Sequence, residues 1–197
     1  MIDPQWLDLD NTIERVVKVL DDLQIPYVFT GGVAVITYGD PRTTNDVDLI
    51  LKISPEENEA AETLINELSE QFHVNLAACR EALLHKTLFQ AIDKENLFKV
   101  DFHVSELLPR QFERCVAQEL ATGRVVPMVS PEDSILSKLL WINMGSDRSR
   151  RDVVGILKMQ KKLDTQYLET TAEELGVKHI LDELKTLAES NDPNIIF

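Results

Sequence analysis

Three aspartates stand on predicted strands, in positions where their carboxylates could act together. Asp46 and Asp48 lie at i and i+2 in the run DVDLILKI at 46–53, and Asp101 lies in the middle of the apolar run FKVDFHV at 98–104. Because successive side chains of a strand face opposite ways, Asp46 and Asp48 point the same way, about 7 Å apart. Two such anions repel each other and are costly to bury unless a cation lies between them. A pair of exposed acids on an edge strand is the alternative.

Magnesium is the natural cation for such a pair, because it is a hard ion that prefers oxygen ligands. If the Asp101 strand neighbours the Asp46 strand, the three carboxylates could hold two ions of Mg²⁺, or of Mn²⁺. Two such ions can clamp the attacking and leaving oxygens of an in-line phosphoryl or nucleotidyl transfer. His103 shares the face of Asp101, and we expect it to belong to an ordinary polar sheet face rather than to ligate metal.

A glycine pair precedes the aspartates. Gly31 and Gly32 end the predicted strand YVFT at 27–30 and open a predicted short helix at 33–39. Glycine lacks a Cβ, so a phosphate can approach the backbone, and the N–H groups at a helix start point toward an anion. We therefore expect Gly31 and Gly32 to bind nucleotide phosphates, although a simple turn would also explain the pair.

Two cations could assist such a site. Lys138 follows the predicted helix cap at Ser130 by eight residues and lies among apolar neighbours, so it faces either solvent or a phosphate. Arg42 comes just before the aspartates and could neutralise a triphosphate, or it could pair with Asp40 in a loop.

The order of elements predicts the α/β (α+β) class, with a mixed twisted sheet, flanking helices and a helical C-terminal portion. We expect a core over 1–129 and a helical portion over 130–197 packed on that core. The predicted elements are a helix over 6–23, a strand at 27–30, a short helix at 33–39, a strand at 46–53, a helix from a cap at Ser54 to about Phe72, a hairpin of 86–93 with 97–104, a helix near 109–121, a strand at 123–129, a helix from the Ser130 cap to about Asn143, and helices thereafter with breaks near 145–146, 164–165 and 176. In residues 73–85 the apolar side chains follow neither the helical nor the strand periodicity clearly.

Charge limits the partners. The formal net charge is -14, so long duplex DNA, which binds many Lys and Arg, is excluded. The stretch 145–162 is nevertheless locally +4, with six basic residues against two acids, which indicates either a small anion-binding face or the solvated side of a helix. Cys79 and Cys115 have no metal-binding spacing and indicate reduced cysteines in a cytoplasmic protein. No apolar run is long enough to cross a membrane.

The run TGGVAVITYGDPRTTNDVDLIL resembles the signature of the polymerase-β-like nucleotidyltransferase superfamily. That signature is a glycine pair, a spacer of about a dozen residues, and then acid–apolar–acid. Here the spacer from Val33 to Asn45 has thirteen residues, and Asp101 is the third acid on a later strand. Thr30 stands where the pattern usually has an apolar residue. The resemblance implies an enzyme that uses an NTP and Mg²⁺.

A narrower resemblance is to the AbiEii-type and related toxin-like nucleotidyltransferases, carried by YGDPRTTNDVDL, SPEDSILSKLLW and SDRSRRDVVGIL. It implies that Lys138 contacts the nucleotide phosphates and that Asp152 is a functional aspartate, although Asp152 could simply pair with Arg148 within its helix. Arg151 carries the same ambiguity between nucleotide binding and a surface role. The resemblance also implies a tRNA 3′ end as the acceptor and an antitoxin protein as a partner. An antibiotic-like small molecule, a protein hydroxyl (AMPylation) and a non-catalytic nucleotide-binding module are the other possibilities.

Overall fold

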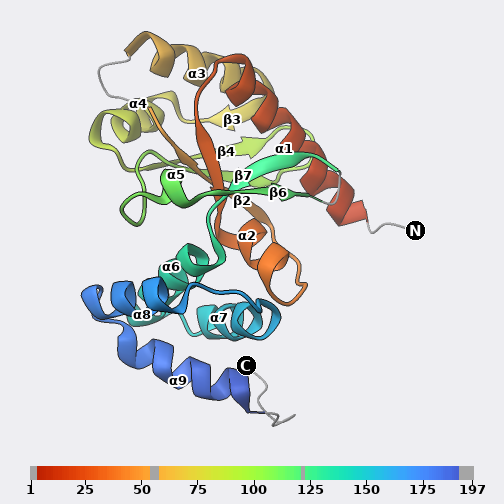
Figure 1. Cartoon of the computed structure of the whole chain (residues 1–197). Helices are drawn as coiled ribbons and strands as arrows, with labels where there is room; N and C mark the ends of the chain where they lie inside the picture. Colours follow the sequence, from red (N-terminus) through yellow and green to blue (C-terminus); the bar gives the residue numbers. More distant parts are fainter. Residues whose placement is uncertain (1–3, 54–57, 121–122, 191–197) are drawn as a thin grey trace. The chain divides into compact units, whose positions relative to one another are not determined.

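The chain is described here by a computed structural model that covers residues 4–53, 58–120 and 123–190. They form two compact units (Figure 1). The sheet unit comprises Met1–Val33 and Thr44–Met128, and the helical unit comprises Ala34–Thr43 and Val129–Phe197. Helix α2 (Gly31–Tyr38) begins in the sheet unit and ends in the helical unit. None of the described helices has both the length and the apolar character needed to cross a membrane.

The sheet unit is built on a mixed sheet, as the sequence predicted. Within the described residues, seven strands lie in the order β3-β4-β5-β2-β1-β7-β6. The strands are β1 (Tyr27–Thr30), β2 (Asp46–Leu51), β3 (Phe72–Val74), β4 (Leu88–Asp93), β5 (Lys99–His103), β6 (Val116–Glu119) and β7 (Val125–Met128). Strand β2 pairs parallel with β5, and β1 pairs parallel with β7. The predicted hairpin is confirmed, because β4 and β5 pair antiparallel.

Alternation along the strands separates a core face from a polar face. Val47 and Leu49 on β2 are fully buried, and so are Val100 and Phe102 on β5, whereas the aspartates between them point to the other face. Helix α3 (Asn58–Gln71) packs against both α1 (Pro4–Asp22) and α4 (Leu76–His85), and α3 and α4 pack against the β3–β4 edge (Figure 1). The described part of α1 carries buried apolar residues at helical spacing: Leu9, Ile13, Val16, Val17 and Leu20.

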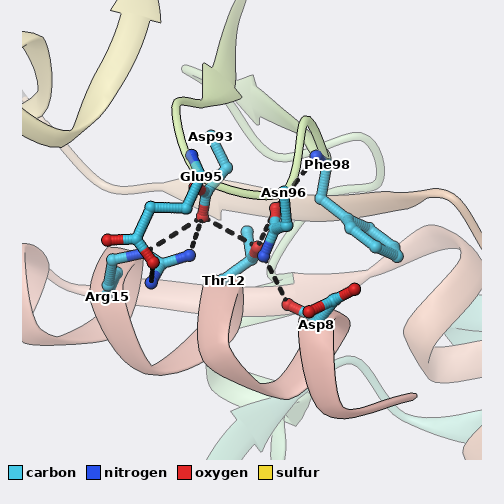
Figure 2. A network of polar contacts seen from close by, with 7 residues as sticks. All are labelled: Asp8, Thr12, Arg15, Asp93, Glu95, Asn96 and Phe98. Atoms are coloured by element: carbon cyan, nitrogen blue, oxygen red, sulfur yellow. Dashed lines mark hydrogen bonds and ion pairs between the residues drawn. The ribbon is translucent and has the colours of Figure 1, made fainter. Parts of the chain in front are cut away.

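A polar network fastens α1 to the turn between β4 and β5 (Figure 2). The carboxylate of Asp93 is fully buried and accepts hydrogen bonds from the Thr12 hydroxyl at 2.9 Å and from Nε of Arg15 at 3.0 Å. Burial by itself would raise the pKa of Asp93, but the bonds from Arg15, Thr12 and the Glu95 backbone N–H outweigh it and lower that pKa. Asn96 adds a bond from its amide nitrogen to a backbone carbonyl of α1. Because Asp93 shares the core face, α1 covers that face.

The helical unit contains α6 (Pro131–Asn143), α7 (Arg148–Met159), α8 (Thr165–Glu174) and α9 (Lys178–Glu189). Helix α6 starts as predicted, because Ser130 Oγ accepts a hydrogen bond from the backbone N–H of Asp133 at 3.1 Å and Pro131 occupies the first turn. Helices α7 and α9 pack together, and α8 packs on α6 (Figure 1). The apolar residues that hold the last two helices are buried, namely Leu168, Ile180, Leu181 and Leu184.

One predicted helix is wrong. Instead of a helix near 109–121, the chain has only the short α5 (Gln111–Arg114), followed by β6. Arg110 adopts a positive φ of 65° just before α5, and the backbone N–H groups of β6 pair with β7. Pairing with β7, the next strand along the chain, which is itself held in the sheet by β1, outweighed local helix propensity. The uncertain stretch 73–85 contains the end of β3 and helix α4, and the cap predicted at Ser54 lies outside the described residues.

Candidate active site

The three aspartates lie side by side on the polar face of the sheet. Strands β2 and β5 are parallel neighbours, and Asp48 stands directly opposite Asp101 in their register. Asp46 is two residues before Asp48, so it shares the same face and stands opposite Lys99. The structure therefore brings together the residues that the sequence singled out, because the predicted strand neighbourhood is present.

A neutral donor holds one oxygen of each carboxylate. The Thr44 hydroxyl donates to Asp46 Oδ1 at 2.9 Å, and the Gly32 backbone N–H donates to Asp48 Oδ2 at 3.1 Å. On the neighbouring strand, Gln90 Nε2 donates to Asp101 Oδ1 at 3.0 Å. These donors fix the orientation of the carboxylates without cancelling their charge, since none of them is ionised.

The other oxygens face groups that carry or can carry positive charge. Lys99 Nζ lies 2.7 Å from Asp101 Oδ2 and 3.9 Å from Asp46 Oδ2. His103 Nε2 lies 4.0 Å from Asp48 Oδ1. Sequence reasoning did not single out Lys99, Thr44 or Gln90. For Lys99 on β5 and Gln90 on β4, the alternation of the strand indicates only that the side chain lies on the polar face; for Thr44 the sequence offers no signal.

The electrostatics show how crowded this face is with negative charge. Burial raises the pKa of Asp48, and the negative charges of Asp46 and Asp101 raise it further. The hydrogen bond from the Gly32 N–H and the charge of His103 partly offset this rise in the pKa. Burial alone would lower the pKa of Lys99, but the three carboxylates outweigh it and raise that pKa, with Asp101 the largest contributor. Burial lowers the pKa of His103 in spite of Asp48 and Asp101.

The glycine pair is packed against two of these groups. A Cβ at Gly31 would lie 1.9 Å from Asp48 Oδ2, and a Cβ at Gly32 would lie 2.3 Å from Thr44 Oγ1. Gly31 also has a φ of +57°, which side-chain-bearing residues rarely adopt. The absence of a side chain here is therefore required by the aspartate and the threonine, whether or not a phosphate also approaches.

A second polar cluster lies within the helical unit. The carboxylate of Asp152 is 4% exposed and accepts hydrogen bonds from Arg42 through Nε at 2.9 Å and through a terminal nitrogen at 3.2 Å. Lys138 Nζ lies 3.1 Å from the same carboxylate. Two cations against one anion leave the cluster with one net positive charge, which suits an anionic ligand.

These pairings decide between the local alternatives. Arg42 pairs with Asp152 across 110 positions of sequence and not with Asp40 as the loop alternative required. Lys138 is half-buried and paired, so the solvent-facing alternative is wrong. Arg151 is exposed on α7, and its assignment to nucleotide binding remains a prediction.

The donor set of the sheet unit suits a divalent cation by its chemistry, because three carboxylates on one face each keep an oxygen that no neutral donor holds. As these side chains stand, however, no group of three His, Cys, Asp or Glu in the described part of the chain is arranged to hold a metal ion. Lys99 stands against two of the carboxylates instead.

The fold of this chain is shared by solved structures that include a nucleotidyltransferase-like protein. The solved structure of the antibiotic-resistance factor ANT(2'')-Ia matches with a TM-score of 0.60 at 16% identity, covering 92% of this chain and 97% of that one. An antigenic nucleotidyltransferase-like protein from Paracoccidioides brasiliensis matches with a TM-score of 0.55 at 20% identity, over 89% and 91% of the two chains. At these identities the likeness is one of fold.

The sequence assigns the chain to a family. Residues 16–189 match the family described as "Nucleotidyl transferase AbiEii toxin, Type IV TA system". The chain belongs to this AbiEii family, and the narrower resemblance seen in the sequence is confirmed. A search of curated proteins finds no match.

Proposed function

We propose that this protein transfers a nucleoside monophosphate from an NTP to an acceptor hydroxyl, with Asp46, Asp48 and Asp101 holding Mg²⁺ or Mn²⁺. The observation that carries the proposal is the set of three carboxylates on one sheet face, each oriented through one oxygen by a neutral donor. Fixed carboxylates favour the transition state because no reorganisation is needed when the charge develops.

In the proposed reaction, the acceptor oxygen forms a bond to the α-phosphorus, and the bond from that phosphorus to the α–β bridging oxygen breaks. Pyrophosphate leaves, and Asp101 receives the proton of the acceptor hydroxyl. When bound, the divalent cation supplies positive charge beside the reacting phosphoryl oxygens. Catalysis then consists of positioning and electrostatics, as in other phosphoryl transfers.

The remaining predicted residues have supporting roles in this proposal. The backbone at Gly31–Gly32 would approach the phosphates, while the Gly32 N–H also orients Asp48. Arg42 and Lys138, and Arg151 with them, would contribute positive charge for the phosphates. Asp152 would act as a positioning residue, because it binds both Arg42 and Lys138.

For the acceptor we propose the 3′ end of a tRNA. What supports it is the basic stretch 145–162, in which most cations are exposed: Arg148, Arg151, Lys158, Lys161 and Lys162. Arg150, by contrast, is paired with Glu183. Phosphate contacts from such cations would make binding fall steeply with salt. An antitoxin is the proposed protein partner, following the family to which the chain belongs.

The transfer step is tested by pyrophosphate release from each of the four NTPs in the presence of Mg²⁺ and a cell extract as the acceptor source. We expect Asp48→Asn, which keeps the size of the side chain but removes its charge, to lower the rate at least about 100-fold. Asp22→Asn is the control, because Asp22 is an exposed acid at the end of α1. Equal rates for wild type and Asp48→Asn would remove Asp48 from the mechanism.

The acceptor is tested with NTPs labelled at the α-phosphate. After incubation with a whole-cell extract, label in tRNA supports the proposal, and salt should suppress that labelling. Label in small molecules or in protein would instead identify those molecules as the acceptor and contradict the proposal of tRNA. Nucleotide binding without label in any fraction would favour a non-catalytic binding module.

A further inference from the structure

Lys99 occupies a special position among the carboxylates of the sheet unit. Its ammonium contacts the oxygens of Asp101 and Asp46 that the neutral donors leave unbound, at 2.7 and 3.9 Å. These are the oxygens that a cation approaching the cluster would need. The ammonium therefore lies where positive charge is required by the aspartates themselves.

The attachment of Lys99 leaves it able to move. Its side chain is 37% exposed, whereas that of Asp101 is only 12% exposed. A lysine has four flexible methylenes and a strongly hydrated ammonium, so it can leave the carboxylates for solvent at moderate cost. The two aspartates are each held through the other oxygen, Asp46 by Thr44 and Asp101 by Gln90.

We propose that Lys99 is a displaceable internal counter-ion that competes with the divalent cation for Asp46 and Asp101. This inference rests on the proposed function, because it assumes that the cation binds to these aspartates. In the absence of nucleotide, the ammonium neutralises part of their charge and weakens binding of free metal. A triphosphate favours the exchange, because its negative charge gives the displaced ammonium a new partner. Metal and nucleotide then bind cooperatively, with Lys99 as the coupling element.

The test is a titration of the full-length chain with Mn²⁺, in which electron paramagnetic resonance reports the free ion. We expect Lys99→Met to lower the Mn²⁺ Kd at least about tenfold, equivalent to about 1.4 kcal/mol. It should also shrink the difference in Kd measured with and without a non-hydrolysable NTP analogue. Lys18→Met is the matched control, since it removes the same charge from an exposed position on α1 that pairs with Asp22. Its effect should be less than about twofold in physiological salt, because solvent screens distant charges.

The outcomes separate this inference from the proposed function. An unchanged or raised Mn²⁺ Kd in Lys99→Met would overturn the counter-ion role, even if Asp48→Asn still abolished transfer. A Kd that is unchanged while nucleotide binding weakens would make Lys99 a phosphate ligand instead. The absence of Mn²⁺ binding in both proteins, together with full activity of Asp48→Asn, would overturn the proposed function itself.

Discussion

The contact between Gly31 and Asp48 allows a steric test of the site. Replacing Gly31 by alanine places a Cβ 1.9 Å from Asp48 Oδ2 and 2.3 Å from its Cγ. Both distances are far below van der Waals contact, so the carboxylate must move. The backbone adds a second cost, because alanine at the observed φ of +57° is disfavoured by about 1–2 kcal/mol.

Gly176 separates these two costs. It has a similar φ of +71°, but a Cβ there would meet nothing within 4 Å. We expect Gly176→Ala to lose about 1 kcal/mol of unfolding free energy and to keep full transferase activity. Gly31→Ala should lose clearly more stability and at least about 100-fold in rate, because displacing a carboxylate by an ångström disrupts positioning.

The assay combines urea unfolding with pyrophosphate release for the two single variants. A double-mutant cycle strengthens it: Asp48→Ala removes Oδ2 and Cγ, the two atoms closest to the new Cβ. In the Gly31→Ala background, Asp48→Ala should therefore cost less stability than in wild type. The reasoning is refuted if Gly31→Ala is as stable and as active as Gly176→Ala, or if the cycle shows no coupling.

Two further predictions concern buried ion pairs. Asp93→Asn should cost about 2 kcal/mol at pH 7, since it removes the charged acceptor of Arg15. Because the folded pKa of Asp93 is lowered, its contribution is fully present above the unfolded pKa of about 3.9 and is lost as the pH falls through the folded value. Urea unfolding from pH 7 to 3 should show the two proteins converging below about pH 4; a constant difference would contradict this. In the second cluster, Arg42→Met and Lys138→Met together should cost more than the sum of the single changes, because only the double variant leaves Asp152 buried without a cation. Asp152→Asn should then restore part of the loss, and additive losses in urea unfolding would argue against a shared partner.

Several parts of the fold could be predicted because their signals are local. The cap at Ser130 and the alternation of β2 and β5 depend on residues close in sequence. The same alternation put Asp46 and Asp48 on one face. The helix expected near 109–121 failed because β6 pairs with the following strand β7, and β7 in turn pairs with β1, which lies far earlier in the chain.

In the candidate site, too, some features could be predicted from the sequence and others depend on the tertiary structure. The spacing of the glycine pair and the aspartates was sufficient to predict the nucleotidyltransferase class, and the family match agrees with it. The roles assigned to Lys138 and Asp152 came from resemblance, and the sequence alone offered only nearby partners for Arg42 and Asp152. Their actual pairing joins positions 110 residues apart, which no local pattern specifies.

The sequence by itself determined which residue types stand at the ends and centres of the strands, and hence that three carboxylates could share one face. Only the tertiary structure decided that Lys99 meets Asp101 and Asp46, and that Gly31 packs against Asp48. The physical reason is that propensity and alternation act between neighbours in the chain, whereas the partner of a charge is fixed by which strands and helices the closed fold places in contact.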